Sequence, residues 1–312
     1  MTVDTVCNWF SMTKPVTATV VAILAERGLL DLDDPVQALY EPFTITRPQS
    51  RRRAVTVRHL LSHSSGLANP LPLRWVRRAD EPAPARSRFV EHLINKHARL
   101  RFEPGRRASY SNLGFLVLGE IIEAVTGQTY EECVEDCLLR PLGMRRTGFT
   151  APAAIPWATP YQRRRTVLNT LLPVLLPRRI IGANEGRYRA LDHFYVTGAS
   201  YGGLIGPSIE AARFLQLHLG DGERDGRRLL STEAAQAMRT VQARGRNLAV
   251  GSGWYRRGRT GRSDYVEHLG GGVGFWNCMR LYPERGLGIV MMGNATSYDH
   301  DSIACAALHQ LA

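Results

Sequence analysis

The sequence predicts an α+β protein, in which a helical lobe precedes an antiparallel sheet and one closing helix. Apolar residues recur at helical spacing in several segments before about residue 245. After that point the pattern changes to short strand-like segments, at 248–255, 265–269, 275–282 and 287–293. The chain has 312 residues, of which 44% are hydrophobic, so it is long enough to bury a large core. We expect one domain, with the helical lobe at about 11–245 and the sheet and closing helix at about 246–312.

The helices are predicted from apolar spacing together with residues that start or stop a helix. The first has Pro15 in its first turn, because proline has no N–H to donate further along a helix. Two short helices are predicted to start after Thr56 and after the capping box of Thr129 and Glu132. The longer predicted helices run from near Ser11 to Gly28, from Leu113 to Val125 with a stop at Gly127, from Ser208 to about Leu219, from Ser231 to about Val241, and from Asp301 to Leu311.

Two segments predict no regular structure, residues 68–88 and residues 151–200. Within the second, Val167 to Leu176 is apolar, is flanked by arginines and contains Pro173. Ten such residues are too few to cross a bilayer. A lid or packed loop is favoured over an interfacial membrane contact, which stays open as the alternative.

Charge and cysteine content narrow the possible partners. Lys+Arg is 40 against 28 Asp+Glu, giving a net charge of +12, but only Lys14 and Lys96 are lysines and the arginines are scattered. This pattern favours a solvated surface over a nucleic-acid partner. The five cysteines lack Cys-x-x-Cys spacing, so they predict neither a zinc site nor a disulfide framework. The chain has no apolar run long enough for a stable membrane span, and no export signal follows Met1. The sequence therefore predicts neither a particular localisation nor an oligomeric state.

Ser11-Met12-Thr13-Lys14 is the first candidate catalytic motif. Serine and lysine three residues apart share one helix face, so the amine can take the hydroxyl proton if burial lowers the pKa of Lys14. The alternative is an exposed lysine on a first helical turn.

Two further motifs follow. Tyr110-Ser111-Asn112 precedes the buried helix, and its alternative is a helix cap beside a core tyrosine. His268-Leu269-Gly270-Gly271-Gly272 ends a predicted strand, where glycines let a substrate approach the backbone N–H groups; its alternative is a glycine-rich turn with a surface histidine.

The three motifs in this order resemble those of the penicillin-recognising serine hydrolases, in the branch of class C β-lactamases, D-aminopeptidases, D,D-carboxypeptidases and related esterases. The similarity extends to four further stretches and covers the chain from about Cys7 to the C-terminus, with residues 151–195 the least similar part. These stretches are Val57–Leu67, Phe102-Glu103-Pro104-Gly105, Pro141-Leu142-Gly143-Met144 and Tyr201-Gly202-Gly203-Leu204-Ile205-Gly206.

The resemblance implies a β-lactamase/transpeptidase-like fold and a serine hydrolase that forms an acyl-enzyme on an ester or amide, with no metal or organic cofactor. It implies Ser11 as nucleophile, Lys14 as its base and Tyr110 as proton shuttle. Asn112, His268, Gly270 and Gly271 would bind the substrate, and the N–H groups of Ser11 and Gly271 would form the oxyanion hole. The implied partner is a small-molecule or peptide substrate.

Two departures from the family pattern shape the expected function. His268 and Leu269 stand where class C β-lactamases usually carry lysine and a hydroxyl residue, which favours esterase or peptidase chemistry over β-lactam hydrolysis. Relatives also carry a longer segment before the Ser-x-x-Lys motif, including two strands of the sheet. We therefore expect a sheet that lacks these strands, an unpaired outer edge on strand 287–293, and poor solubility or oligomerisation.

Two other functional classes stay open. A binding module of the same fold without turnover is the alternative to a hydrolase, and labelling of Ser11 by a covalent serine probe separates the two. An α/β-hydrolase is disfavoured because we expect no Gly-x-Ser-x-Gly turn in the chain; Ser62-His63-Ser64-Ser65-Gly66 lacks the first glycine.

Overall fold

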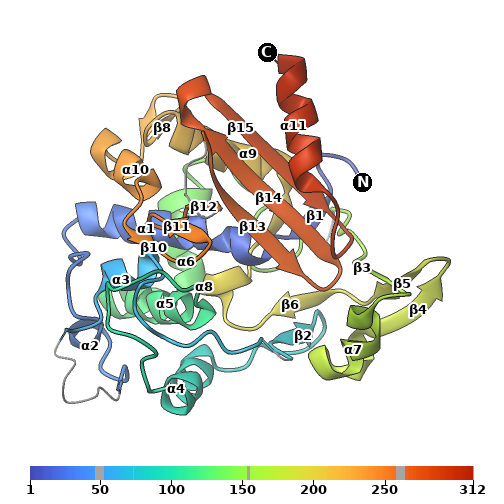
Figure 1. Cartoon of the computed structure of the whole chain (residues 1–312), viewed down its shortest axis with the longest axis horizontal. Coiled ribbons are helices and arrows are strands. Elements are labelled where there is room, and N and C mark those ends of the chain that lie inside the picture. The colour runs from blue at the N-terminus through green and yellow to red at the C-terminus, as the bar shows by residue number, and fades with distance from the viewer. Residues whose placement is uncertain (46–52, 73, 153–154, 258–263, 312) are drawn as a thin grey trace.

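A computed structural model describes residues 1–45, 53–72, 74–152, 155–257 and 264–311. The gaps remove Leu73 from the predicted loop 68–88, and residues 153–154 from the predicted irregular segment 151–200. Elements are labelled as in Figure 1, which shows the helices gathered beside a twisted sheet and α11 standing at the sheet's outer side.

Helix α1 (Thr13–Glu26) is the central element, and all its side chains from Thr13 to Leu24 are buried. It packs against the helices α5, α6 and α8 and against strand β13. The buried threonine hydroxyls have partners inside the core; Thr17, for example, donates to the carbonyl of Ser200 at 2.7 Å. Because this helix is buried on every side, any polar group on it is withdrawn from water.

The start of α1 corrects one prediction. The α-helix begins at Thr13, and Ser11 lies in the preceding 3-10 turn η1 (Phe10–Met12). Phe10 has a φ of 48°, in the left-handed region that side chains rarely adopt, and its ring packs near Phe194 and Phe275. This packing turns the chain sharply just before Ser11, which the helical periodicity did not reveal. Pro15 lies in the first turn as predicted.

The other predicted helices of the lobe are confirmed, with changes at their ends. Thr56 and Thr129 each form a capping box, the first with His59 and the second with Glu132. Helix α5 is capped by Ser111, and its C-terminal Gly127 has a φ of 69°. The bounds are α3 (Val57–Leu61), α5 (Asn112–Thr126), α6 (Tyr130–Val134) with a π-helical turn η2 (Glu135–Leu139), α9 (Ser208–Leu219) and α10 (Thr232–Arg239). Two short helices, α2 (Val36–Leu39) and α8 (Ala199–Gly202), were not predicted.

The segments expected to be irregular contain several elements. Strand β2 (Val76–Arg78) and the start of helix α4 (Arg86–Lys96) fall within 68–88, and the apolar spacing of Val90, Leu93 and Ile94 in α4 was overlooked. Residues 151–200 hold the strands β3 (Tyr161–Arg163), β4 (Ile181–Glu185), β5 (Tyr188–Leu191) and β6 (Phe194–Val196), helix α7 (Val167–Leu175) and a 3-10 turn η3 (Arg178–Ile180). Short strands paired over long sequence distances, such as β2 with β6, carry no local signal.

The main sheet has six antiparallel strands among the described residues, in the order β10-β11-β12-β13-β14-β15, where at most four were predicted. The predicted strand 248–255 is two strands, because Gly251, Ser252 and Gly253 break it where Gly253 passes Pro15 and Ala18 of α1. The strands are β10 (Ala243–Arg244), β11 (Leu248–Val250), β12 (Tyr255–Arg257), β13 (Val266–Gly272), β14 (Phe275–Tyr282) and β15 (Leu287–Gly293), with a 3-10 turn η4 (Pro283–Arg285) between the last two.

Helices cover both faces of this sheet. Met279 and Leu281 on one face join the main core, and Gly288 lies against Leu215 and Leu219 of α9. Arg280 on the other face bonds to α11 (His300–Leu311), the predicted closing helix. The sheet is therefore a layer between α9 and α11, with its β13 side against η1 and α1.

Strand β15 ends the sheet within the described residues, and its side chains are only half-buried apart from the exposed Gly288. The short strand β1 (Val6–Asn8) pairs instead with β7 (Ile205–Pro207), and β8 (Glu223–Arg224) with β9 (Arg227–Arg228). None of the helices in the described part of the chain has the length and apolarity needed to cross a membrane. The division into lobes at about residue 245 stays a prediction.

Candidate active site

Ser11 and Lys14 lie together where η1 passes into α1. The Lys14 Nζ atom is 3.0 Å from Ser11 Oγ, 2.9 Å from Asn112 Oδ1 and 2.7 Å from the carbonyl oxygen of Tyr201. These partners come from three elements, η1, α5 and α8, which pack around the first turn of α1. The predicted pair is thus held by groups that lie about 100 and 190 residues away in the sequence.

The surroundings of Lys14 disfavour its charged form. The side chain is fully buried, and burial holds the pKa of Lys14 well below its ordinary value. Among the described residues, no carboxylate forms an ion pair with it. A neutral amine has two N–H donors and one lone pair, which match two carbonyl-type acceptors and the Ser11 hydroxyl as a donor. The geometry therefore fits an amine that can accept the Ser11 proton.

Tyr110 closes the site from the loop before α5. Its ring centroid is 4.9 Å from Lys14 Nζ, and its ring packs on His63 with a centroid distance of 4.4 Å. Burial raises the pKa of the Tyr110 hydroxyl, and hydrogen bonding to Ser11 opposes this rise. The phenol stays protonated at neutral pH, so it fits a group that relays a proton better than a resting base.

Asn112 is the first residue of α5, and its amide is oriented by Lys14. Its Oδ1 accepts from the amine, while its backbone N–H donates to Oδ1 of Asn69 at 3.0 Å. The side-chain NH₂ is thereby left to donate into the neighbouring cavity, which Asn112 lines.

The glycines of β13 let the strand approach η1. A Cβ atom at Gly270 would strike the carbonyl oxygen of Trp9, and one at Gly272 would strike the Phe10 ring. Gly271 and Gly272 line the same cavity as Ser11, whereas Gly270 does not. Gly270 therefore has a packing reason to be glycine, and Gly271 is the predicted residue that faces the cavity.

His268 is buried behind the cavity wall. Its Nδ1 is 2.8 Å from the carbonyl oxygen of Leu269, and its ring packs on Tyr255 and near Tyr110. Burial lowers the pKa of His268 to about 3. The imidazole is therefore neutral at pH 7, with Nδ1 as donor, and its Nε2 has no partner among the described residues.

A cavity of about 170 Å³ opens beside Ser11. No charged side chain lines it within the described residues, and most of its walls are aromatic or aliphatic. The walls include Phe10, Trp75, Leu175, Leu176, Phe194 and Val196. Such a cavity suits an uncharged apolar group.

Sequence reasoning missed two contributors. Tyr201 supplies a backbone carbonyl to Lys14 and a ring 5.2 Å from Nζ, but it was noted only within a family-like stretch. His63 accepts a hydrogen bond from the backbone N–H of Ser111 and supports the Tyr110 ring. A backbone contribution has no side-chain signature, so no local pattern could have assigned the role of Tyr201.

One serine motif was also overlooked. Gly198-Ala199-Ser200-Tyr201-Gly202 fits the Gly-x-Ser-x-Gly pattern, between β6 and α8. Ser200 is fully buried against Gly119, and its hydroxyl has no partner among the described residues. A nucleophile needs an exposed hydroxyl and an adjacent base, so Ser200 is a packing residue.

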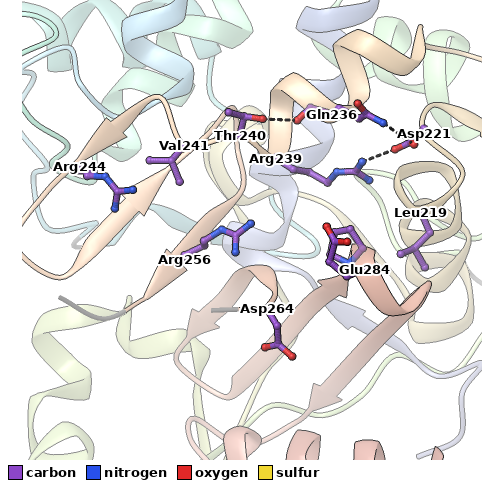
Figure 2. A pocket seen from close by; sticks show the side chains of 11 residues that line it. Leu219, Asp221, Gln236, Arg239, Thr240, Val241, Arg244, Arg256, Asp264 and Glu284 are labelled. Carbon is purple, nitrogen blue, oxygen red and sulfur yellow. Dashed lines mark hydrogen bonds and ion pairs between the residues drawn. The ribbon is translucent and has the colours of Figure 1, made fainter. Parts of the chain in front are cut away.

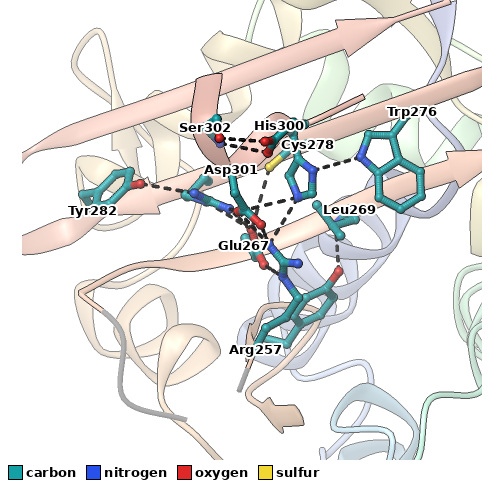
Figure 3. Close-up of polar contacts among 12 residues, drawn as sticks. Arg257, Glu267, Leu269, Trp276, Cys278, Tyr282, His300, Asp301 and Ser302 are labelled. Carbon is teal, nitrogen blue, oxygen red and sulfur yellow. Dashed lines mark hydrogen bonds and ion pairs between the residues drawn. The ribbon is translucent and has the colours of Figure 1, made fainter. Parts of the chain in front are cut away.

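Two other polar clusters lack this chemistry. Glu267, His300 and Asp301 are close enough for a metal, but Figure 3 shows Arg257 among them, and Arg280 also binds both carboxylates. The guanidinium groups occupy the carboxylate oxygens, so this cluster, the α11 clasp, fastens α11 to β13.

A larger polar groove of about 900 Å³ lies between the ends of α9 and α10 and the sheet. Figure 2 shows both acidic and basic side chains around it, and Arg239 pairs with Asp221. None of the candidate site residues lines this groove.

The chain matches the beta-lactamase family model over residues 1–312. It belongs to that family. It is 26% identical over 294 residues to the D-alanyl-D-alanine-carboxypeptidase/endopeptidase AmpH of Escherichia coli (strain K12), covering 91% of this chain and 70% of that protein. It is 32% identical over 170 residues to esterase EstB of Burkholderia gladioli, covering 51% of this chain and 42% of that protein.

A solved structure has the same fold. The octameric penicillin-binding protein homologue from Pyrococcus abyssi superposes with a TM-score of 0.75 at 28% identity, over 99% of this chain and 66% of that one. This chain therefore spans just under two thirds of that neighbour's length. The comparisons confirm the β-lactamase/penicillin-binding-protein fold and a relationship to hydrolases.

Proposed function

We propose that this protein is a serine acyl hydrolase in which Ser11 forms the acyl-enzyme. The observation that carries the proposal is the fully buried Lys14 amine, 3.0 Å from Ser11 Oγ and without a carboxylate partner among the described residues. An uncharged amine at that distance activates a hydroxyl, which is a weak nucleophile by itself.

Acylation follows from the positions of these groups. Lys14 takes the Ser11 proton while Oγ bonds to the substrate carbonyl carbon. The resulting oxyanion is stabilised by the N–H groups of Ser11 and Gly271. The proton then passes through Tyr110 to the leaving oxygen or nitrogen, and the bond to the leaving group breaks.

Deacylation repeats these steps with water. Water gives a proton through Tyr110 to Lys14 while its oxygen bonds to the acyl carbon. The bond between the acyl carbon and Oγ then breaks, the carboxylic acid leaves, and the proton returns from Lys14 to Oγ, which restores Ser11. Asn112 donates from its NH₂ to the substrate carbonyl side. His268, which lies behind the cavity wall, offers no cation to the substrate, because its pKa of about 3 leaves it uncharged at neutral pH.

The expected substrates are esters or amides, of the esterase, D-amino-acid peptidase or carboxypeptidase type. The carboxypeptidase type is the least favoured of the three, because its substrates carry a C-terminal carboxylate. The cavity beside Ser11 offers no cationic side chain among its described lining, so a carboxylate-bearing β-lactam gains no ion pair there. This favours ester and peptide substrates over β-lactams. The names of the relatives, a carboxypeptidase and an esterase, agree with both remaining types.

Hydrolysis of short-chain aryl esters, compared with a chromogenic carboxylate-bearing lactam, tests the proposal. We expect ester turnover that is lost in Ser11→Ala and kept in Ser302→Ala, a matched change at an exposed serine. If the wild-type protein hydrolyses the esters no faster than buffer does but binds them reversibly, the protein is a binding module. Lactam turnover that exceeds ester turnover would contradict the substrate class.

A further inference from the structure

Helix α7 exposes an apolar face although it is firmly packed. Val167, Leu171 and Val174 are 78%, 45% and 57% exposed, and their spacing of four and three residues places them on one side of the helix. Figure 1 shows α7 at the edge of the molecule, beside the small sheet of β3, β5 and β4 and away from α1. Three neighbouring exposed apolar side chains on one helix indicate a contact surface.

The opposite face of α7 belongs to the protein interior. Leu172 is buried, and Leu175 and Leu176 line the cavity beside Ser11. The Leu175 carbonyl accepts from the backbone N–H of Arg74 at 2.9 Å. The helix is therefore fixed by its inner face, and its outer face is available to a partner.

Arginines flank α7 in the sequence and gather at its first turn. Residues 161–191 contain seven arginines and one acidic residue, Glu185. A hollow of about 660 Å³ at the first turn of α7 is lined by Thr166, Asn169 and five of these arginines, Arg163, Arg164, Arg165, Arg187 and Arg189. No acidic residue lines the hollow in the described part of the chain, and none of the five arginines forms an ion pair there.

We propose that the α7 face, meaning Val167, Leu171, Val174 and the arginine-lined hollow, binds the surface of an anionic phospholipid bilayer. Apolar side chains flanked by cations fit the boundary between acyl chains and phosphate headgroups. Five guanidinium groups beside a helix N-terminus complement phosphates. The helix lies on the bilayer and does not cross it, because nine residues are too short.

The position of the face links it to the candidate active site. Leu71 is 73% exposed and lines the cavity together with Leu175 and Leu176. A bilayer on the α7 face would thus lie next to the mouth of the cavity. This arrangement would present amphiphilic substrates to Ser11 from the membrane surface.

Vesicle co-sedimentation tests the proposal without any substrate, so its result is independent of the hydrolase proposal. Wild-type protein should bind vesicles that contain phosphatidylglycerol and should bind phosphatidylcholine vesicles much more weakly. The triple variant Arg163→Gln/Arg164→Gln/Arg165→Gln should lose about a hundredfold in affinity for the anionic vesicles. The double variant Val167→Glu/Val174→Glu should lose at least about tenfold.

Matched controls separate the face from general charge and hydrophobicity. Arg99→Gln/Arg101→Gln/Arg106→Gln removes the same charge from exposed positions elsewhere, and Ile303→Glu changes an apolar residue of α11 that is 50% exposed. Both should bind as the wild type does, and thermal melting should show that all variants fold. Equal binding by the test and control variants would overturn the proposal. Failure of the wild-type protein to bind anionic vesicles would also overturn it. If, in addition, Val167→Glu/Val174→Glu converts an oligomer into a monomer, the α7 face is a contact between copies of this chain and not a membrane surface.

Discussion

The charge state of Lys14 in the folded protein gives a prediction whose size follows from linkage. In the unfolded chain the amine has its ordinary pKa of 10.5, whereas burial lowers the pKa of Lys14 well below that value in the native state. Between these two pKa values only the unfolded chain holds the proton. The free energy of unfolding must therefore rise with pH in this window, by about 1.4 kcal/mol per pH unit from this one group.

Lys14→Met removes this contribution while keeping the length of the side chain. The difference in free energy of unfolding, wild type minus Lys14→Met, should increase by about 2.5 kcal/mol between about pH 8 and pH 10. Urea unfolding across that range measures it, and the other titrating groups cancel in the difference. Its absolute value at one pH is not the readout, because Lys14→Met also leaves Asn112 and the Tyr201 carbonyl without a donor.

Lys96, the other lysine of the chain, is the matched control. It is exposed on α4, so Lys96→Met should give a difference from the wild type that does not change with pH. If the Lys14→Met difference is equally flat, then Lys14 is protonated in the native state at neutral pH. A protonated amine has no lone pair for the Ser11 proton, and the proposed base would be refuted.

Three further predictions concern the base, the strand β13 and the α11 clasp. Lys14→Arg should slow acylation as much as Lys14→Ala, by about 10²–10⁴-fold in single-turnover ester kinetics, because a guanidinium keeps its proton. If Lys14→Arg acylates at a rate near that of the wild type, Lys14 acts as a positive charge and not as a base. Gly270→Ala should lower the free energy of unfolding by about 1–3 kcal/mol, whereas Gly148→Ala, which has open space around it, should not. Equal urea midpoints for these two variants would contradict the close approach of β13 to η1. Glu267→Gln should cost about 3–5 kcal/mol, because it leaves the buried Arg280 with Asp301 as its one carboxylate partner among the described residues, whereas the exposed Glu284→Gln should change stability negligibly. Similar melting of both variants would show the clasp to be weak.

Local signals predicted the elements on which the candidate site is built. The caps at Thr56 and Thr129, the proline in the first turn of α1 and the stop at Gly127 all depend on residues close in sequence, and the structure confirms them. The resemblance supplied the pairing of Ser11 with Tyr110 and Asn112, which no periodicity contains. The structure then places Lys14 within 2.9 Å of Asn112.

What the sequence did not predict depends on packing between distant segments. The break of strand 248–255 follows from the close passage of Gly253 over α1, and the 3-10 turn at Ser11 follows from the left-handed Phe10 packed on two distant rings. The contribution of Tyr201 to the candidate site is a backbone carbonyl, which any residue could offer. In each case the identity of the residue does not indicate which distant residue it contacts.

Intact-protein and peptide mass measurement after reaction with a fluorophosphonate shows directly which serine is the activated nucleophile. Wild-type protein should give one adduct per chain, on the peptide that contains Ser11. Ser11→Ala should give no adduct, and Lys14→Arg should react far more slowly while still melting cooperatively. A folded wild type that gives no adduct, or an adduct at another serine, would contradict the assignment of Ser11 as the activated nucleophile.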